Sequence, residues 1–256
     1  MVSKNQPERA PHLVGLIRFA GSAPLLLFGW FLFSGPWLLI DLGFSETGST
    51  CWNGALSILF FGMHSGMIRR SLRARLAGCL PEHYHRALYT IISGLVLTAV
   101  VLLWQPSNTV LLELQGAFRW FARSVFLLGL AGFAWSSLAL ESFDAFGTEG
   151  LKARSNGIRH APQPLTIRGP YRWVRHPFYF FALLLIWSGP DLTVDRLFFN
   201  VLWTAWIFVG TVLEEQDLVV AHGRAYRRYR SAVPMLVPWK GPADVEAPGP
   251  EGQALD

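Results

Sequence analysis

Six apolar runs, separated by segments that carry most of the charge, dominate this 256-residue chain. A helix that crosses a bilayer core needs roughly 20 predominantly apolar residues, with about 17 as the minimum. In hydrocarbon every backbone polar group must find a partner within the chain, and a helix satisfies this requirement internally. We therefore predict an all-α, polytopic integral membrane bundle with about five to six transmembrane helices. The runs are residues 16–40, 52–67, 88–104, 124–140, 178–190 and 197–213.

The composition also favours a membrane protein over a soluble domain. Hydrophobic residues make up 52% of the chain and charged residues only 15%, whereas a soluble domain carries roughly 25% charged residues. The first run is too long for the apolar core of a signal peptide, so we expect it to be retained as a span. Cys51 and Cys79 form no Cys-x-x-Cys pair, and no three ligands have zinc spacing, so we predict no metal site.

Lysine and arginine predict the orientation, because cytoplasmic loops carry an excess of both. If the N-terminus is cytoplasmic, 19 of the 22 Lys and Arg lie on the cytoplasmic side, and only Arg119, Arg123 and Arg196 do not. We therefore predict that both termini are cytoplasmic. The basic residues are spread over several short loops, a pattern that argues against a nucleic-acid partner.

The fifth run, residues 178–190, is short for a complete span. Pro177 precedes it and suits the first position of a helix, and Gly189-Pro190 ends it. We expect either a half-span or one arm of a tight helical hairpin that turns at residues 191–193.

Polar side chains gather at the ends of the last two runs, where their cost in a membrane indicates a functional site. Glu214 and Glu215 directly follow the sixth run. The pair also fits an ordinary acidic helix end, although carboxylates are disfavoured near a helix C-terminus. We therefore expect the helix to run on to about residue 220, or the carboxylates to face a cation, which would be Arg172, Arg175 or a sulfonium group.

Several other side chains each have a structural and a functional interpretation. His176 precedes proline, which biases it away from the α conformation; it would cap the corner or donate to a bound carboxylate or ribose. Tyr179 lies on the same helical face and would pack in the core or line a pocket. Tyr226 and Tyr229 would join the arginines of an interfacial belt or attract a sulfonium with their rings. His64 would be a buried structural histidine or would assist proton removal.

The segments 141–175 and 214–239 are expected to form a cytoplasmic cap over a membrane-embedded cavity. A loop as long as the first is uncommon without a function. The tail, rich in proline, glycine and acidic residues, is expected to be disordered. We therefore divide the chain into N-terminal transmembrane helices (1–140), a core with loop, hairpin and cap (141–239), and a disordered tail (240–256).

The order of these motifs resembles the isoprenylcysteine carboxyl methyltransferase superfamily. The matching motifs are Gly-Pro-Tyr at 169–171, Arg-His-Pro-x-Tyr at 175–179, Glu-Glu at 214–215, Tyr-x-x-Tyr at 226–229 and Val-Pro at 233–234. The N-terminal half is similar to NnrU-type proteins and bacterial methanethiol S-methyltransferases, through Phe-Gly-Met-His-Ser at 61–65, Tyr89 and Trp-Gln-Pro at 104–106. The glycine-rich motif of Rossmann-type enzymes is absent from the sequence.

The resemblance implies an S-adenosyl-L-methionine (SAM)-dependent enzyme of the bacterial inner membrane that converts methanethiol to dimethyl sulfide. Its partners would be the lipid bilayer and a small volatile or lipophilic thiol, with no obligate protein partner. Arg172 and Arg175 would hold a carboxylate or close the site. The implied catalytic residues are Arg175, His64 and Glu214, and the implied cofactor-binding residues are Tyr171, His176, Tyr179, Glu214, Glu215, Tyr226 and Tyr229.

The reacting thiol must ionise, because the thiolate is the nucleophile. His64 or a carboxylate of the cap would accept the proton, and Arg172, Arg175 or the cofactor's charge would favour the thiolate. Residues 148–163 depart from the family pattern and leave the substrate open. The alternatives are methylation of another lipophilic thiol or an isoprenylcysteine-like carboxylate, and a non-catalytic NnrU-type membrane protein of nitrogen-oxide metabolism.

Overall fold

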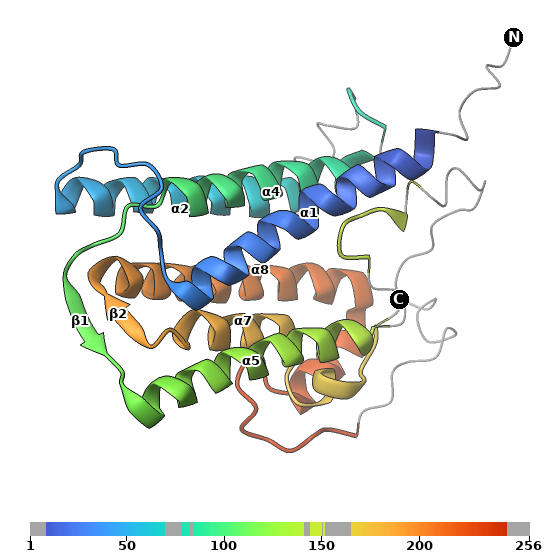
Figure 1. Cartoon of the computed structure of the whole chain (residues 1–256). Coiled ribbons are helices and arrows are strands. Elements are labelled where there is room, and N and C mark those ends of the chain that lie inside the picture. Colours follow the sequence, from blue (N-terminus) through green and yellow to red (C-terminus); the bar gives the residue numbers. More distant parts are fainter. Residues whose placement is uncertain are drawn as a thin grey trace, which may run out of the picture. The chain divides into compact units, whose positions relative to one another are not determined.

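The computed structural model describes residues 9–69, 78–81, 84–140, 144–149, 151 and 165–244, and over these ranges it is mostly helical (Figure 1). The predicted all-α class is confirmed, with one two-stranded ladder added. The α-helices are α1 (Arg9–Ser34), α2 (Glu46–Ile68), α4 (His85–Leu103), α5 (Gly116–Leu138), α7 (Pro177–Trp187) and α8 (Val194–Ala232). The remaining elements are the 3-10 helix η2 (Gly169–Arg172) and the strands β1 (Val110–Glu113) and β2 (Asp191–Thr193).

Four of the described helices are long and apolar enough to cross a bilayer: α1, α4, α5 and α8. The chain is therefore a multi-pass membrane protein. α2 has 23 residues, but its first two turns are rich in polar side chains and it is not one of the four. α7 has 11 residues and is about 16 Å long at 1.5 Å per residue, so it is too short for a full span. This length agrees with the predicted half-span or hairpin arm.

Several helix ends differ from the predicted runs, among them the C-terminal ends of α1 and α8. α1 stops at Ser34, because Gly35 takes a φ of 87° and Pro36 follows, a combination that terminates helices. The last helix continues past the end of its apolar run at residue 213, as expected from the glutamate pair, and extends beyond the expected residue 220 to Ala232. Gly223, with φ 51° and ψ −124°, interrupts its regular geometry and produces a kink.

The described helices fall into two compact units. In the first, α4 packs against both α1 and α2. Asn53, fully buried, exchanges two hydrogen bonds with the backbone of Gln105, at 2.7 and 2.9 Å. Trp104 donates from its indole nitrogen to Asp195 at 2.9 Å. These bonds explain the folding role of the Trp-Gln-Pro motif, which joins the end of α4 to Asn53 in α2 and to Asp195 at the start of α8.

The second unit is built on the packing of α5 against α7. Gly129 and Gly132 in α5 face the side chains of Leu185 and Phe181 in α7. Small residues at such positions let two membrane helices approach closely. Of the described residues, the unit includes β1, α5, residues 165–192 and residues 196–244. Our division at residue 140 remains a prediction.

Substituting Gly132 with alanine is expected to destabilise this unit. A Cβ atom at Gly132 would overlap the ring of Phe181, and overpacking of this kind costs about 1–3 kcal/mol. We expect Gly132→Ala to lower the Tm of the purified protein in detergent. Gly29→Ala is the matched control, because a Cβ atom at Gly29 in α1 meets nothing within 4 Å. Equal Tm values for the two variants would contradict this account of the packing.

Candidate functional site

The corner before α7 is held in place by the segment that follows α8. The backbone N–H groups of Arg175 and His176 donate to the carbonyls of Pro234 and Met235, at 2.9 and 3.2 Å. Pro177 begins α7, and His176 has φ −122° and ψ 67°, outside the α region, as predicted. Two segments far apart in the sequence thus meet here and bring the predicted site residues together.

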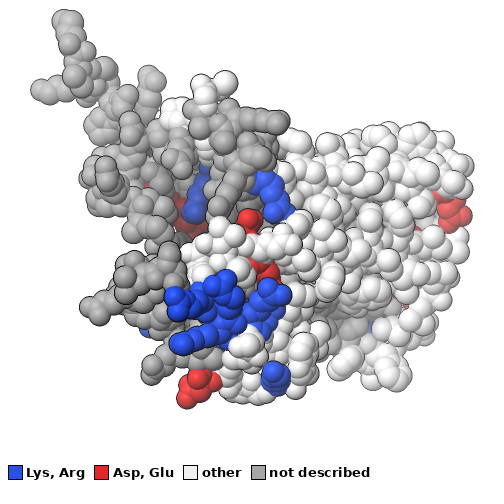
Figure 2. Space-filling view, turned by 180° about the vertical axis from the view of Figure 1, so that it is seen from behind, with Lys and Arg blue, Asp and Glu red and all other residues white. Residues whose placement is uncertain are grey.

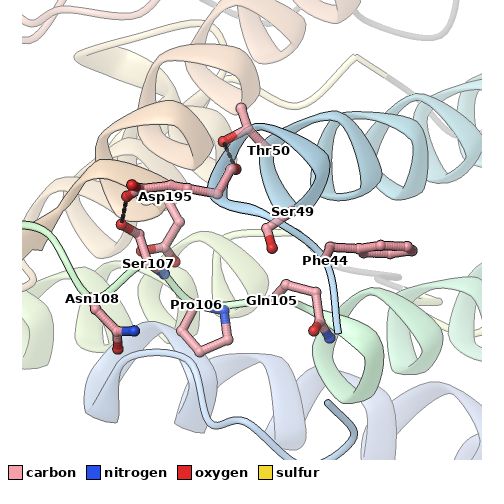
Figure 3. A pocket seen from close by; sticks show the side chains of 9 residues that line it. Phe44, Ser49, Thr50, Gln105, Pro106, Ser107, Asn108 and Asp195 are labelled. Atoms are coloured by element: carbon pink, nitrogen blue, oxygen red, sulfur yellow. Dashed lines mark hydrogen bonds between the residues drawn. The ribbon is translucent and has the colours of Figure 1, made fainter. Parts of the chain in front are cut away.

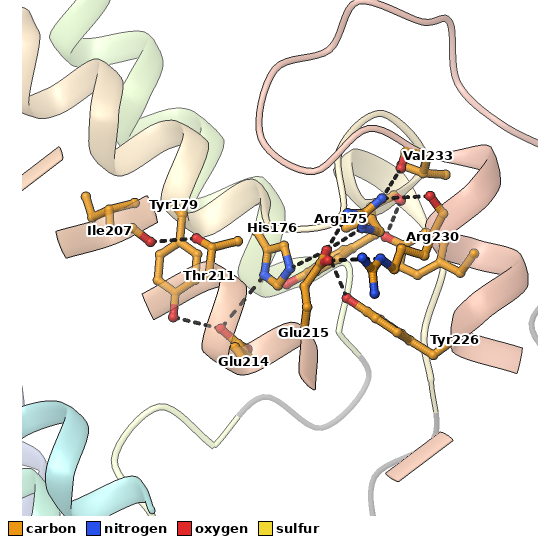
Figure 4. A network of polar contacts seen from close by, with 12 residues as sticks. Arg175, His176, Tyr179, Ile207, Thr211, Glu214, Glu215, Tyr226, Arg230 and Val233 are labelled. Carbon is orange, nitrogen blue, oxygen red and sulfur yellow. Dashed lines mark hydrogen bonds and ion pairs between the residues drawn. The ribbon is translucent and has the colours of Figure 1, made fainter. Parts of the chain in front are cut away.

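Glu215 is the centre of the polar network shown in Figure 4. It is 5% exposed, and its Oε1 accepts from Arg175 Nε at 2.6 Å. Arg230 Nε lies 3.3 Å from its Oε2, and Tyr226 donates to its Oε1 at 3.4 Å. Both expectations for this residue are therefore confirmed, because it lies inside a continuing helix and faces cations. Its charge is compensated within the protein.

Glu214 has a different environment, because adjacent helical residues point in different directions. Its side chain is 45% exposed and accepts from the Tyr179 hydroxyl at 2.7 Å. The Tyr179 ring stacks on His176, with ring centroids 5.7 Å apart. Among the described residues, no arginine or lysine is paired with Glu214. Of the two carboxylates, Glu214 is therefore the one that can still accept hydrogen bonds from a ligand or face its positive charge.

His176 is neutral at neutral pH, because burial lowers its pKa below 6.5 despite the opposing carboxylates of Glu214 and Glu215. Its Nε2 lies 3.3 Å from Glu215 Oε1. A carboxylate only accepts hydrogen bonds, so we assign the proton to Nε2. Nδ1 is then an acceptor, 3.8 Å from Glu214 Oε2. Two acceptors 3.8 Å apart favour a ligand that brings N–H donors or positive charge.

This arrangement predicts an acid limit for the binding of a cation. As the pH falls below 6.5 and passes the lowered pKa of His176, protonation places a positive charge beside Glu214. We expect cation affinity to be constant from about pH 8 to 6.5 and to fall below that range. Titration calorimetry at several pH values measures this profile. In His176→Gln the decline should shift to the lower pH at which carboxylates titrate. An unchanged profile in that variant would contradict the assignment.

The tyrosines of the cap are buried, which rules out the interfacial-belt interpretation for them. Tyr226 and Tyr229 are 1% and 2% exposed and pack with Ile167 and Val233. The Tyr229 hydroxyl donates to the Tyr171 carbonyl at 2.6 Å. Burial and the nearby Glu214 carboxylate raise the pKa of Tyr171, so its hydroxyl stays protonated. These side chains form a buried cluster beside the polar network, and Tyr226 contacts Glu215 directly.

Arg172 does not face the glutamate pair, contrary to one of the predicted alternatives. Its guanidinium donates to the Ala243 carbonyl at 2.9 Å and to Asp244 at 3.0 Å. The Ala243 N–H donates back to the Arg172 carbonyl at 2.9 Å. The predicted disorder of the tail is therefore corrected for residues 240–244, while residues 245–256 lie outside the described part. The proximal tail is therefore hydrogen-bonded to the last residue of η2.

His64 lies in the first unit, in α2. Its ring nitrogens lie 3.1 Å from the Tyr89 hydroxyl, and its ring stacks on Phe60 with centroids 5.0 Å apart. Tyr89 entered our sequence analysis only through the family resemblance. Its hydroxyl fixes the orientation of a polar ring in an apolar environment. Most of residues 148–163, which depart from the family pattern, lie outside the described part of the chain.

A hollow of about 140 Å³ lies in the first unit, and Figure 3 shows its lining. Asp195 faces it but accepts from Trp104, Ser107 and Thr193, at 2.9, 3.0 and 2.6 Å. The carboxylate is thus used to join the end of α4 to the start of α8. We assign no ligand to this hollow.

Two features of the site were missed by sequence reasoning. Arg230 is one of the arginines for which an interfacial belt was one interpretation, and its pairing with Glu215 was not predicted. The carbonyls of Arg230 and Val233 accept from Arg175 Nη1, at 2.8 and 2.6 Å. The first had a weak signal, since Arg230 directly follows the Tyr-x-x-Tyr motif. The second had no signal, because any residue at positions 230 and 233 would offer the same backbone carbonyl.

The network fits the predicted cofactor in part. SAM carries a sulfonium and an amino group, and Glu214 with His176 Nδ1 supplies acceptors for positive charge. Arg175 directs its guanidinium at Glu215 and at two carbonyls, so in this arrangement it does not offer itself to the cofactor's carboxylate. Among the described residues there is no group of three potential metal ligands.

Comparison with known proteins places the chain in a family. No family model matches it, and no solved structure matches it. The methanethiol S-methyltransferase of Pseudomonas deceptionensis is 34% identical over 188 residues, covering 72% of this chain and 70% of the relative. The protein of the same name from Mycobacterium tuberculosis is 29% identical over 182 residues, covering 71% and 75%. Nurim of Rattus norvegicus is 28% identical over 233 residues, covering 84% and 87%.

The resemblance that we derived from the ordered motifs is thus confirmed by independent similarity over most of the chain. With 34% identity over at least 70% of both proteins, the chain belongs to the family of the methanethiol S-methyltransferases.

Proposed function

We propose that this protein methylates methanethiol to dimethyl sulfide with SAM as the methyl donor. The proposal is supported by its family and by one observation in the structure. Glu214 and the Nδ1 atom of His176 are two acceptors 3.8 Å apart, and Glu214 is not balanced by a described arginine or lysine. Such a pair suits a ligand that carries positive charge.

SAM supplies a methyl group already activated on a sulfonium sulfur. With SAM bound, the thiolate sulfur would form a bond to that methyl carbon as the bond between the methyl carbon and the sulfonium breaks. The products are dimethyl sulfide and neutral S-adenosylhomocysteine, and the thiol proton passes to a base. The protein must therefore hold a cation, ionise a thiol and align the two. Alignment at about 3–3.5 Å supplies a large part of the acceleration.

Each predicted residue has a proposed task. Glu214 attracts the cationic cofactor, and Tyr179 fixes the Glu214 carboxylate through its 2.7 Å hydrogen bond. His176 accepts from the cofactor through Nδ1. Glu215, Tyr171, Tyr226 and Tyr229 build the wall behind them. We propose Arg175 as a positioning residue, because its donors are directed at Glu215 and at backbone carbonyls.

His64 is the proposed proton acceptor for the thiol, with Tyr89 orienting its ring. We expect His64→Ala to lower kcat more than SAM affinity. Tyr89→Phe should give a smaller loss in kcat, because the base remains. A further measurement is the dependence of rate on pH: the fall in rate at low pH that results from protonation of His64 should be lost in His64→Ala. Unchanged turnover in this variant would make His64 a structural residue.

The direct test is gas analysis of the headspace above bacteria that express the protein and receive methanethiol. We expect dimethyl sulfide well above an empty-vector control. Ethanethiol and a long-chain thiol, assayed in the same way, test the preference for a small acceptor. Absence of a methylated product together with intact SAM binding would reject the substrate and keep the methyltransferase. Absence of both would reject the enzyme.

We propose that the protein resides in the cytoplasmic membrane of a bacterium with both termini in the cytoplasm. The distribution of lysine and arginine supports this orientation. In it, the Glu214 network faces the compartment that contains SAM. Labelling of single cysteines introduced at residues 45 and 239 with an impermeant reagent would distinguish the two sides, in a background lacking Cys51 and Cys79. Equal labelling of both positions from outside would contradict the proposed orientation.

A further inference from the structure

The part of α8 beyond Gly223 has two unlike faces. Tyr226, Tyr229 and Val233 are at most 2% exposed, and their spacing of three and four residues puts them on one side of the helix. That inner side is the wall of the Glu214 network. The other side carries exposed side chains, namely Arg224, Arg227, Arg228 and Ser231.

The outer face and the loop after it are strongly basic. Residues 224–240 contain four arginines and one lysine, and no aspartate or glutamate. Arg230 is used by Glu215, while Arg227, Arg228 and Lys240 are exposed. Figure 2 shows a patch of Lys and Arg, with a few Asp and Glu at its edges.

Exposed apolar side chains accompany these cations. Trp239 is 68% exposed and Val237 is 57% exposed, although both follow a tightly hydrogen-bonded segment. Tryptophan is enriched where a membrane meets water, because its ring is apolar and its N–H is polar. The apolar part of α8, a candidate span, ends shortly before this segment. Cations, an exposed tryptophan and the end of a span therefore occur together within residues 213–240.

We propose that residues 224–240 form a docking surface for the headgroups of anionic phospholipids in the surrounding leaflet. The charge of the surface is complementary to phosphate, and a cluster of Lys and Arg beside a span is attracted to anionic lipid. Trp239 and Val237 favour a lipid over free phosphate, because they would enter the apolar boundary. This surface is separate from the proposed cofactor site, and its binding of lipid does not depend on methyl transfer.

Residues 224–240, the proposed lipid surface, also contact the residues of the proposed cofactor site. Its carbonyls at Pro234 and Met235 accept the N–H groups of Arg175 and His176, and Arg230 contacts Glu215. A lipid bound to the outer face would therefore restrain the residues that hold the network together. Lipid binding should consequently stabilise the folded protein.

The test uses the full-length protein purified in a neutral detergent. Ligands that bind only the folded state raise the Tm, so we compare phosphatidylglycerol with phosphatidylcholine at matched concentrations. We expect a rise with phosphatidylglycerol that grows with its concentration and shrinks at high salt, and little change with phosphatidylcholine. Inorganic phosphate should not reproduce the rise. Equal shifts with both lipids, or the full shift with phosphate, would overturn the proposal.

Variants locate the effect on this surface. Arg227→Gln/Arg228→Gln should lose most of the shift, while Arg227→Lys/Arg228→Lys should keep it because the charge remains. Arg18→Gln/Arg86→Gln removes the same charge from exposed positions elsewhere and should keep the shift. A full shift in the Arg227→Gln/Arg228→Gln variant would show that the lipid binds elsewhere. Comparison of the lysine and glutamine substitutions also decides the matter if one variant folds poorly.

Discussion

Glu214→Gln should weaken SAM binding on the order of tenfold to a hundredfold while leaving the fold intact. The substitution keeps the size and the acceptor for Tyr179 but removes the negative charge. Interactions of hydrogen-bonded charged groups contribute about 1.5–3 kcal/mol, and about 1.4 kcal/mol corresponds to a factor of ten. The 45% exposure of the Glu214 side chain limits the structural consequences, so the Tm should remain close to that of the wild type.

The measurement is the equilibrium dissociation constant of SAM for the purified protein, with headspace dimethyl sulfide as a second readout. Asp217→Asn is the matched control, since it removes an equal charge from an exposed position on the same helix. S-adenosylhomocysteine, which lacks the sulfonium charge, should lose less affinity than SAM in Glu214→Gln. Equal losses for the two compounds would mean that Glu214 does not act on the sulfonium.

Much of the architecture was predictable because a bilayer restricts what an apolar run can become. The runs identified the helices, and Pro177 marked the start of α7. The glutamate pair indicated a helix that continues, because carboxylates at its C-terminus would be unfavourable. The pattern did not reveal that α8 extends to Ala232, since residues 214–232 are mostly polar. Helices outside the apolar core have a weaker periodic signal.

The partners of the arginines could not be predicted in the same way. Arg172 and Arg175 are three residues apart, yet one pairs with Asp244 and the other with Glu215. Which carboxylate each one meets depends on how the segment after α8 folds back onto the corner before α7. That return is made by backbone hydrogen bonds at Pro234 and Met235, and such bonds are independent of side-chain identity.

The difference between these two arginines leads to the second prediction with a large effect. Arg175→Leu should reduce the free energy of unfolding by about 3–5 kcal/mol, the usual cost of removing one partner from a buried ion pair. The Arg175 and Glu215 side chains are 8% and 6% exposed. Removing the guanidinium leaves Glu215 with Arg230, His176 and Tyr226 at 3.3, 3.3 and 3.4 Å, and leaves the carbonyls of Arg230 and Val233 without this donor.

Arg172→Leu is the natural control, because its ion pair with Asp244 is exposed and surface pairs contribute little. We expect chemical denaturation to show a large loss for Arg175→Leu and a value close to wild type for Arg172→Leu. Arg175→Lys should fall between, since lysine keeps the charge but cannot direct several N–H groups at fixed acceptors. Glu215→Leu combined with Arg175→Leu should recover part of the lost stability, because the buried charge is removed as well. If the double variant were less stable than Arg175→Leu alone, Arg230 and His176 would be sufficient partners for Glu215. The positioning role that we assign to Arg175 would then be wrong.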